Sequence, residues 1–213
     1  MGALSLTLGR LSNAQARILL ATAVFAAASI WNSPFPALTP LQAIPTFVAL
    51  AALALAGRRW GVSTASLACL CLFLALHTIG GRYIYSFVPY DEWFAALGLT
   101  TPSELFGWQR NHYDRLVHFA FGLLWFPLLR ELLVRKGGLS PRWSTYVAVE
   151  AVLAASAAYE IFEWWLTLVM APGNADAYNG QQGDIWDAQK DMALAFVGTL
   201  IAAVVSSIRK KRS

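Results

Sequence analysis

Long apolar runs, separated by short polar stretches, follow one another along this chain. A helix that spans a membrane needs about 20 mostly apolar residues, with a range of about 17–25. The pattern therefore predicts an all-α, polytopic membrane helical bundle of about six transmembrane helices, forming a single integral membrane domain over residues 1–213. The predicted spans are residues 18–33, 41–57, 62–79, 114–134, 143–170 and 187–208.

The longest polar stretch separates the third and fourth spans, at residues 80–111, and it is rich in aromatic residues. It contains Pro89 and Pro102, which argue against a continuous helix. Tyr90 to Leu97 predicts a short interfacial helix on the outer side of the membrane.

The first span has a second interpretation, because Arg10 and Arg17 precede it and Ala26 to Ala28 are similar to a signal-peptide cleavage site. We favour a retained first helix, since the bulky Trp31 and a second span follow directly.

Composition agrees with the membrane assignment. The chain is 57% hydrophobic and 13% charged, whereas an average soluble domain is about 45–50% apolar and about 25% charged. Disordered chains are poor in apolar and aromatic residues, so disorder is excluded as well. Cys69 and Cys71 point about 200° apart on a helix, and we expect them to pack as small apolar side chains without forming a bridge.

The distribution of the 16 Lys and Arg residues predicts the orientation. With both termini in the cytoplasm, only Arg82, Arg110, Arg115 and Lys190 lie outside. The same bias explains the net charge of +4 without nucleic acid, and a nucleic-acid-binding role is therefore excluded. The inner set is Arg10, Arg17, Arg58, Arg59, Arg130, Arg135, Lys136, Arg142, Arg209, Lys210, Lys211 and Arg212.

Acidic residues show the opposite bias. Of the 12 Asp and Glu residues, all but Glu131 and Glu150 fall in the outer half, Asp176 among them. The 3 histidines, at positions 77, 112 and 118, also lie in the outer half. The chain therefore has a polar site at one face of the membrane.

The fourth span begins with a carboxylate and an imidazole on one face. Asp114 and His118 are four residues apart, so a helix brings them together, and His112 lies just above them. These residues could cap the helix and anchor it at the interface. They could also bind a metal or transfer a proton, because a histidine one turn inside a membrane is costly without a partner.

Three aspartates open the sixth span, namely Asp184, Asp187 and Asp191. Their spacing places them within about 60° on a helical wheel, where like charges repel and need a cation, a shared proton or a basic partner. The helix dipole stabilises acids in the first turn only. It accounts for Asp184 and Asp187 but not for Asp191.

Glu160 and Glu163 lie one turn apart in the fifth span, next to a tryptophan pair typical of the outer interface. Glu163 could reach water, whereas the deeper Glu160 should face the bundle interior. An ion pair of Glu160 with Arg115 or Lys190 is the structural alternative.

Taken together, these residues predict a carboxylate-rich site that suits Mg, Mn, Ca or a hydrolytic Zn ion. We expect Glu160 to act as a base, His112 to take part in proton transfer, and Arg115 or Lys190 to hold an anionic headgroup. No phosphate loop, dinucleotide motif or nucleophile elbow is present. The expected metal ligands are Asp114, His118, Glu163, Asp184, Asp187 and Asp191.

Several of these segments resemble a family of bacterial inner-membrane proteins of the YjdF type. The resemblance covers about residues 77–208 and is carried by His77 to Gly80, Val88 to Asp91, Arg110 to Phe119 and Gln182 to Met192. It implies an inner-membrane location and no particular activity. The chain is more weakly similar to VanZ-like proteins, linked to glycopeptide resistance, through Asp114 to Phe119, Glu160 and the aspartates of the last span. That similarity implies a role in the cell envelope.

Three functions follow from the sequence. The first is a metal-dependent enzyme that acts on a lipid or envelope precursor at the outer face, with membrane lipids as its surroundings. The second is a small ion- or proton-coupled transporter, in which Glu150, about 15 Å below Glu160, forms a relay toward the cytoplasm. The third is a non-catalytic membrane protein whose charges form a structural ion-pair network.

Overall fold

Six long apolar helices dominate the computed structural model, which describes residues 9–169 and 181–212. Residue 170, the predicted end of the fifth span, and Asp176 lie outside the described residues. Each predicted span corresponds to one of these helices, so the prediction of a polytopic helical membrane protein is confirmed. The six helices are α1 (Asn13–Ile30), α2 (Thr39–Trp60), α3 (Thr64–Arg82), α6 (Tyr113–Arg135), α7 (Pro141–Val169) and α9 (Asp187–Arg212).

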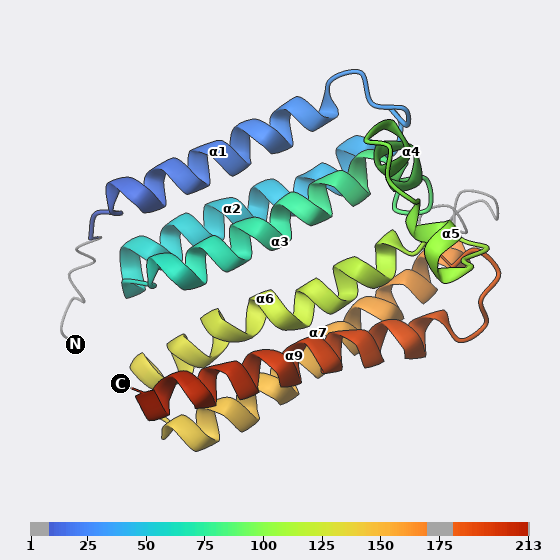
Figure 1. Cartoon of the computed structure of the whole chain (residues 1–213). Helices are drawn as coiled ribbons and strands as arrows, with labels where there is room; N and C mark the ends of the chain where they lie inside the picture. Colours follow the sequence, from blue (N-terminus) through green and yellow to red (C-terminus); the bar gives the residue numbers. More distant parts are fainter. Residues whose placement is uncertain (1–8, 170–180, 213) are drawn as a thin grey trace.

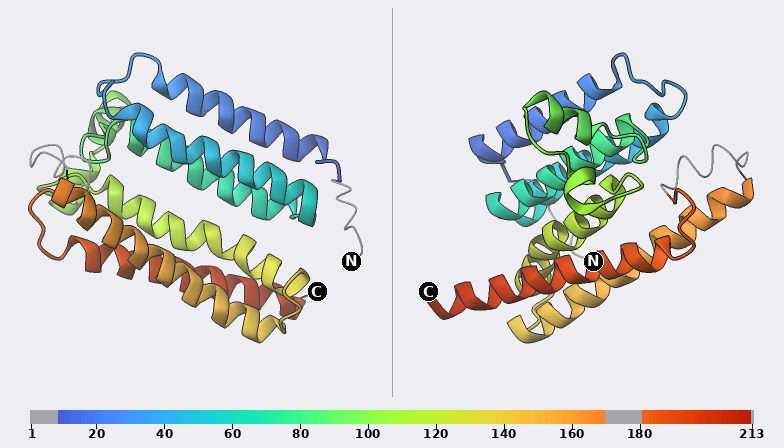
Figure 2. Two further views of the ribbon diagram at one scale, coloured as in Figure 1. Left: turned by 180° about the vertical axis from the view of Figure 1, so that it is seen from behind. Right: turned by 45° about the vertical axis from the view of Figure 1, so that its right-hand side comes forward.

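The long helices form two groups of three (Figure 1). One group contains α1, α2 and α3, the other contains α6, α7 and α9, and α3 packs against α6 to join them. The same two groups are visible from behind (Figure 2). The start of α1 and the end of α9 lie at one end of the bundle. This arrangement agrees with an even number of crossings, and the predicted orientation with both termini inside stays a prediction.

The first helix differs from its predicted limits at both ends. It begins before residue 18 because Ser12 and Gln15 form a capping box, in which each side chain accepts a hydrogen bond from the other residue's backbone N–H. It ends before residue 33 because Trp31 adopts extended backbone and Asn32 has a φ of 48°. The apolar run therefore continues past the helix itself.

Two short helices lie at the end opposite the termini (Figure 1). The predicted interfacial helix is confirmed as α4 (Tyr90–Ala96). The sequence analysis did not predict the second, α5 (Pro102–Phe106), whose start carries a capping box between Thr101 and Glu104. Asp91 ties the two together, since it accepts hydrogen bonds from the Ser103 backbone and hydroxyl at 3.1 and 2.6 Å.

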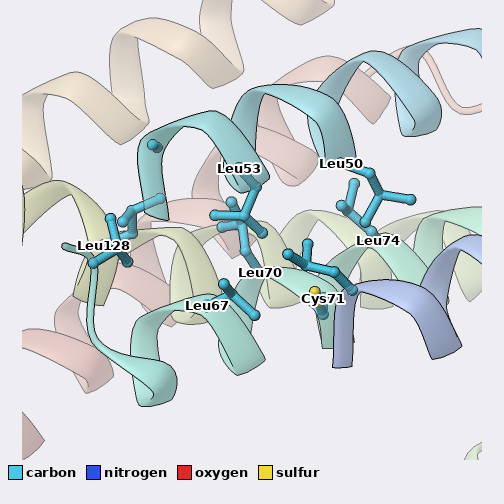
Figure 3. Close-up of a cluster of buried hydrophobic side chains, with 10 residues drawn as sticks. Leu50, Leu53, Leu67, Leu70, Cys71, Leu74 and Leu128 are labelled. Atoms are coloured by element: carbon cyan, nitrogen blue, oxygen red, sulfur yellow. The ribbon is translucent and has the colours of Figure 1, made fainter. Parts of the chain in front are cut away.

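An apolar core fills the α1–α3 group and extends to α6 (Figure 3). Cys71 is buried in this core, and no disulfide joins it to Cys69, in agreement with the prediction. Because lipid tails are as apolar as these side chains, close van der Waals packing, and not removal from water, stabilises the contact of α3 with its neighbours. The labelled core residues are Leu50, Leu53, Leu67, Leu70, Cys71, Leu74 and Leu128.

The closest helix contact is between α6 and α9, and it depends on two glycines. A Cβ on Gly122 would collide with the backbone carbonyl of Ala195, and a Cβ on Gly198 would collide with that of Phe119. Small residues let two backbones approach in this way in membrane helices. The contact brings the start of α9 beside the start of α6, where the candidate site lies.

Candidate functional site

The start of α6 is held in place by loop residues that follow α3. The Asn111 side chain accepts a hydrogen bond from the Tyr113 N–H at 3.0 Å and donates one to the Val88 carbonyl at 2.8 Å. The Tyr113 hydroxyl donates to the Leu76 carbonyl at 3.0 Å. These bonds tie the first turn of α6 to α3 and fix the position of the next residue, Asp114.

Three side chains with metal-binding atoms meet just below this turn. Asp114 and His118 from α6 and Asp191 from α9 each offer one ligand atom, and these atoms lie within 4.8 Å of one another. All three residues are buried, and Asp191 is only 1% exposed. The predicted pairing of Asp114 and His118 is geometrically present, with His118 Nε2 at 3.7 Å from Asp114 Oδ1.

Glu160 of α7 completes this group. Its Oε1 atom lies 3.7 Å from His118 Nε2, so two carboxylates approach the same imidazole nitrogen. The structural alternative for Glu160, an ion pair with Arg115 or Lys190, is not what the structure shows, because both cations pair with Asp184. We call Asp114, His118, Glu160 and Asp191 the inner cluster.

One oxygen of each carboxylate in the inner cluster lacks a hydrogen-bond donor among the described residues. Asp114 Oδ2, Glu160 Oε1 and Asp191 Oδ1 are buried and have no hydrogen-bond partner in the described part of the chain. A buried polar group without a partner costs about 1–3 kcal/mol, and more when it is charged. The arrangement is therefore incomplete as a purely structural network.

Glu163, predicted as a ligand, lies outside the three-residue group. It is buried on α7, one turn beyond Glu160, and has Tyr159 as a hydrogen-bond partner. The Glu163 carboxyl therefore bonds to Tyr159 and is not part of the group of three candidate ligands.

An ion-pair layer covers the outer side of the inner cluster. Arg110 Nη1 lies 2.8 Å from Asp187 Oδ1 and 3.4 Å from Asp184 Oδ2. Arg115 pairs with Asp184 and lies 3.5 Å from Asp187 Oδ1, and Lys190 Nζ lies 2.6 Å from Asp184 Oδ2. We call these five residues the outer ion-pair layer.

This layer separates the three aspartates that were predicted to share one helical face, and α9 begins only at Asp187, so Asp184 precedes the helix. Asp184 and Asp187 meet cations, whereas Asp191, one turn deeper, meets Asp114 and His118. Arg110 was predicted to lie on the outer side but not to belong to the site. Its position at the start of the segment Arg110 to Phe119, which contains the predicted ligands Asp114 and His118, could have indicated its role.

His112 borders the ion-pair layer. Its Nδ1 atom lies 3.2 Å from Arg115 Nη1, and its ring contacts that of Trp108, with the centroids 4.4 Å apart. Burial and the nearby charges of Arg115 and Arg110 lower the pKa of this imidazole. His112 does not reach the inner cluster in this arrangement; it acts as a neutral hydrogen-bond partner of Arg115.

Asp184 has the opposite surroundings. Its hydrogen bond from Lys190, followed by one from the Trp186 backbone N–H and one from Arg115, lowers the pKa of this carboxyl. It is the common partner of three cations and stays ionised at neutral pH.

His77 belongs to a neighbouring part of the site. Its Nδ1 atom forms a hydrogen bond with the Tyr85 hydroxyl, as expected for a hydrogen-bonded core histidine. Its Nε2 atom has no hydrogen-bond partner within the described ranges and lines a cavity that also reaches Asp114 and His118. The sequence contained no signal for this cavity.

The fold and the site together define a multi-pass helical membrane protein with a buried carboxylate–histidine cluster near one end of the bundle. The family model described as "Predicted membrane protein (DUF2238)" matches residues 14–212, and the chain belongs to this family. It is 35% identical over 167 residues to the inner membrane protein YjdF of Escherichia coli strain K12, covering 77% of this chain and 75% of that protein. No solved structure matches the chain.

These comparisons confirm the YjdF-type resemblance and a multi-pass location in the inner membrane. The similarity to VanZ-like proteins, and the role in the cell envelope that it implies, stay predictions.

Proposed function

We propose that this protein is a divalent-metal-dependent enzyme that acts on a lipid or envelope precursor at the outer side of the membrane. One observation carries the proposal. Asp114, His118 and Asp191 each offer one ligand atom within 4.8 Å of the other two, and buried carboxylate oxygens of this cluster have no donor within the described residues.

Electrostatics favours a cation at this point. Two carboxylate charges within 4.8 Å of each other repel by about 3 kcal/mol or more at an effective dielectric constant of about 20. One imidazole carries at most one positive charge, whereas the inner cluster holds three carboxylates. The cations of the outer ion-pair layer do not relieve this repulsion directly, because they are engaged by Asp184 and Asp187.

The donor set restricts the choice of metal. Carboxylate oxygens with one imidazole nitrogen suit Mg, Mn, Ca or a hydrolytic Zn ion, and no thiolate is near. A bound ion of this kind polarises an ester or phosphoryl oxygen and activates water.

The protein's own residues supply the remaining functions. Glu160 is the candidate base, because its carboxylate lies beside His118 but outside the three-residue ligand group. The outer ion-pair layer fixes the start of α9 against α6 and so positions Asp191. Arg115 and Lys190 belong to the outer ion-pair layer, and their proposed role is to hold an anionic headgroup there.

The transport alternative receives no support from the position of Glu150. This residue is exposed on α7, so it does not line an interior path below Glu160.

The test uses Glu160→Gln, with Glu150→Gln as its matched control on the same helix. Purified protein in nanodiscs of inner-membrane lipid extract is loaded with Mn²⁺ or Zn²⁺, and lipid products are followed by mass spectrometry. We expect products with wild type and Glu150→Gln, none after chelation, and a loss of about 100-fold or more in Glu160→Gln with metal content unchanged. A metal-loaded wild type that consumes no lipid or envelope precursor from the extract would contradict the enzymatic role.

A further inference from the structure

A cavity of about 280 Å³ lies beside the inner cluster, between α2, α3, α6 and α7. Its walls are mostly apolar and include Phe73, Val117, Phe121 and Trp125. At its outer end it reaches Asp114 and His118. One continuous space therefore connects the buried polar site with an apolar interior.

The cavity has the length of one lipid leaflet. Asp114 and Trp125 mark its extent along α6, and their sequence separation of 11 corresponds to about 16 Å at 1.5 Å per residue. The hydrocarbon core of a bilayer is about 30 Å thick, so one leaflet contributes about 15 Å. The cavity runs along the helices, in the same direction as the lipid tails outside.

The rim of the cavity opens sideways. Pro45 of α2 and Ala155 of α7 both line it and both are exposed on the surface of the bundle. In the described parts of the chain, α2 and α7 are not among the helix pairs that pack closely. A chain from the surrounding bilayer can enter between these two helices without leaving the membrane.

The walls carry hydrogen-bond donors that lack acceptors. The Thr46 and Ser156 hydroxyls line the cavity, are buried, and have no hydrogen-bond partner among the residues described. Each hydroxyl can donate one hydrogen bond. A saturated or isoprenoid hydrocarbon chain offers these groups nothing, whereas the carbonyl oxygens of an acyl ester accept their hydrogen bonds.

We infer that this cavity binds one acyl chain of an ester-linked membrane lipid, which enters between α2 and α7 and directs its polar end toward Asp114 and His118. The inference deepens the proposed function and rests on it for the place of reaction, since it names acyl-ester lipids as the substrate class. Binding itself depends on the cavity and not on a metal ion.

The experiment uses phosphatidylglycerol with a diazirine in one acyl chain, incorporated into nanodiscs that hold metal-free protein. After irradiation, labelled peptides are mapped by mass spectrometry. We expect labelling of Phe73, Phe121 and Trp125, which face the cavity. Labelling restricted to the exposed faces of α1 and α9 would overturn the inference.

Two neighbouring alanines provide a matched pair. Ala155→Trp places a large side chain in the mouth of the cavity, whereas Ala154→Trp adds the same side chain at an exposed position that does not line it. We expect cavity labelling to fall to background in Ala155→Trp and to stay at the wild-type level in Ala154→Trp. Ala49→Leu, a smaller change on the opposite wall, should reduce labelling even if Ala155→Trp does not fold. Unchanged labelling in folded Ala155→Trp would overturn the inference.

A last comparison distinguishes acyl esters from other chains. Unlabelled ester-linked phosphatidylglycerol should compete with the probe about fivefold better than its ether-linked analogue or a polyprenyl phosphate does. This factor corresponds to the free energy of one neutral hydrogen bond. Ser156→Ala removes one of these hydroxyls and should reduce this preference. Equal competition by all three would overturn the assignment to esters. The protein in this experiment is metal-free, so lipid binding is measured independently of metal binding. If the protein binds metal but not the lipid, the lipid inference alone is contradicted. If it binds the lipid but no metal, the proposed metal enzyme alone is contradicted.

Discussion

Gly122 of α6 lies so close to Ala195 of α9 that a Cβ on the glycine would collide with the alanine's backbone carbonyl. Asp191 is one helical turn before Ala195, and Asp114 and His118 lie one to two turns before Gly122. The backbone contact therefore sets the distance between the two helices that supply the candidate metal ligands.

Gly122→Ala should weaken both packing and metal binding. Inserting a methyl group into a well-packed contact costs about 1–3 kcal/mol, and here the neighbouring atoms are backbone that cannot rotate away. We expect a lower unfolding temperature and weaker metal affinity, and the same for Gly198→Ala. Val197→Ala is the control, because Val197 is 45% exposed on the same turn. A Gly122→Ala protein with wild-type melting and metal titration would show that the contact does not position the ligands.

Asp184 should contribute to stability in an acid-dependent way. Its lowered pKa, caused first by Lys190 and then by Trp186 N–H and Arg115, means that the folded state holds this proton more weakly than the unfolded state. The contribution is present above the unfolded pKa of about 3.9 and is lost as the pH falls through the lower folded pKa. The unfolding temperature of wild type should fall between neutral and strongly acidic pH, and that of Asp184→Asn should fall less. The exposed control, Glu92→Gln, should follow wild type. Parallel curves for wild type and Asp184→Asn would contradict this role.

The six spans were predictable because each is a long apolar run, and the Asp114–His118 pair was predictable because residues four apart share a helical face. The different interaction partners of Asp184, Asp187 and Asp191 were not predictable. A helical wheel places all three together, and only the tertiary position of Arg110 and Arg115 decides which carboxylates meet a cation. The cavity was not predictable either, since it is formed by four helices whose packing no single segment specifies.

His112 should give the protein a second pH dependence, near neutrality. Burial, then Arg115 and Arg110, lower its pKa, so the folded state resists protonation that the unfolded state accepts at about pH 6.5. Stability should therefore be full above that pH and fall as the pH decreases below it. Histidine titrates over a range of about pH 8 to 5. Across this range, the unfolding temperature of His112→Asn should depend less on pH than that of wild type. An identical pH profile in the variant would contradict this assignment.

Glu131 should stabilise the other end of the bundle. It accepts hydrogen bonds from the Ser63 N–H at 2.8 Å and from the Ser63 and Ser66 hydroxyls at 2.6 Å, which ties the start of α3 to α6. Glu131→Ala removes the acceptor for all three and should cost about 1–3 kcal/mol. Arg135→Ala should cost less than about 1 kcal/mol, because this partner of Glu131 is 51% exposed. Chemical unfolding of both variants in detergent checks the order, and a larger loss in Arg135→Ala would reverse the interpretation.

Titration of chelator-treated protein with Mn²⁺ and Zn²⁺ measures whether the inner cluster binds a metal ion. Asp191→Asn and Asp184→Asn make the same chemical change at two aspartates, one in the inner cluster on α9 and one in the outer ion-pair layer just before α9. We predict a single metal ion per chain in wild type and Asp184→Asn, and its loss in Asp191→Asn. No binding by wild type, or equal binding by wild type and Asp191→Asn, would contradict the metal centre.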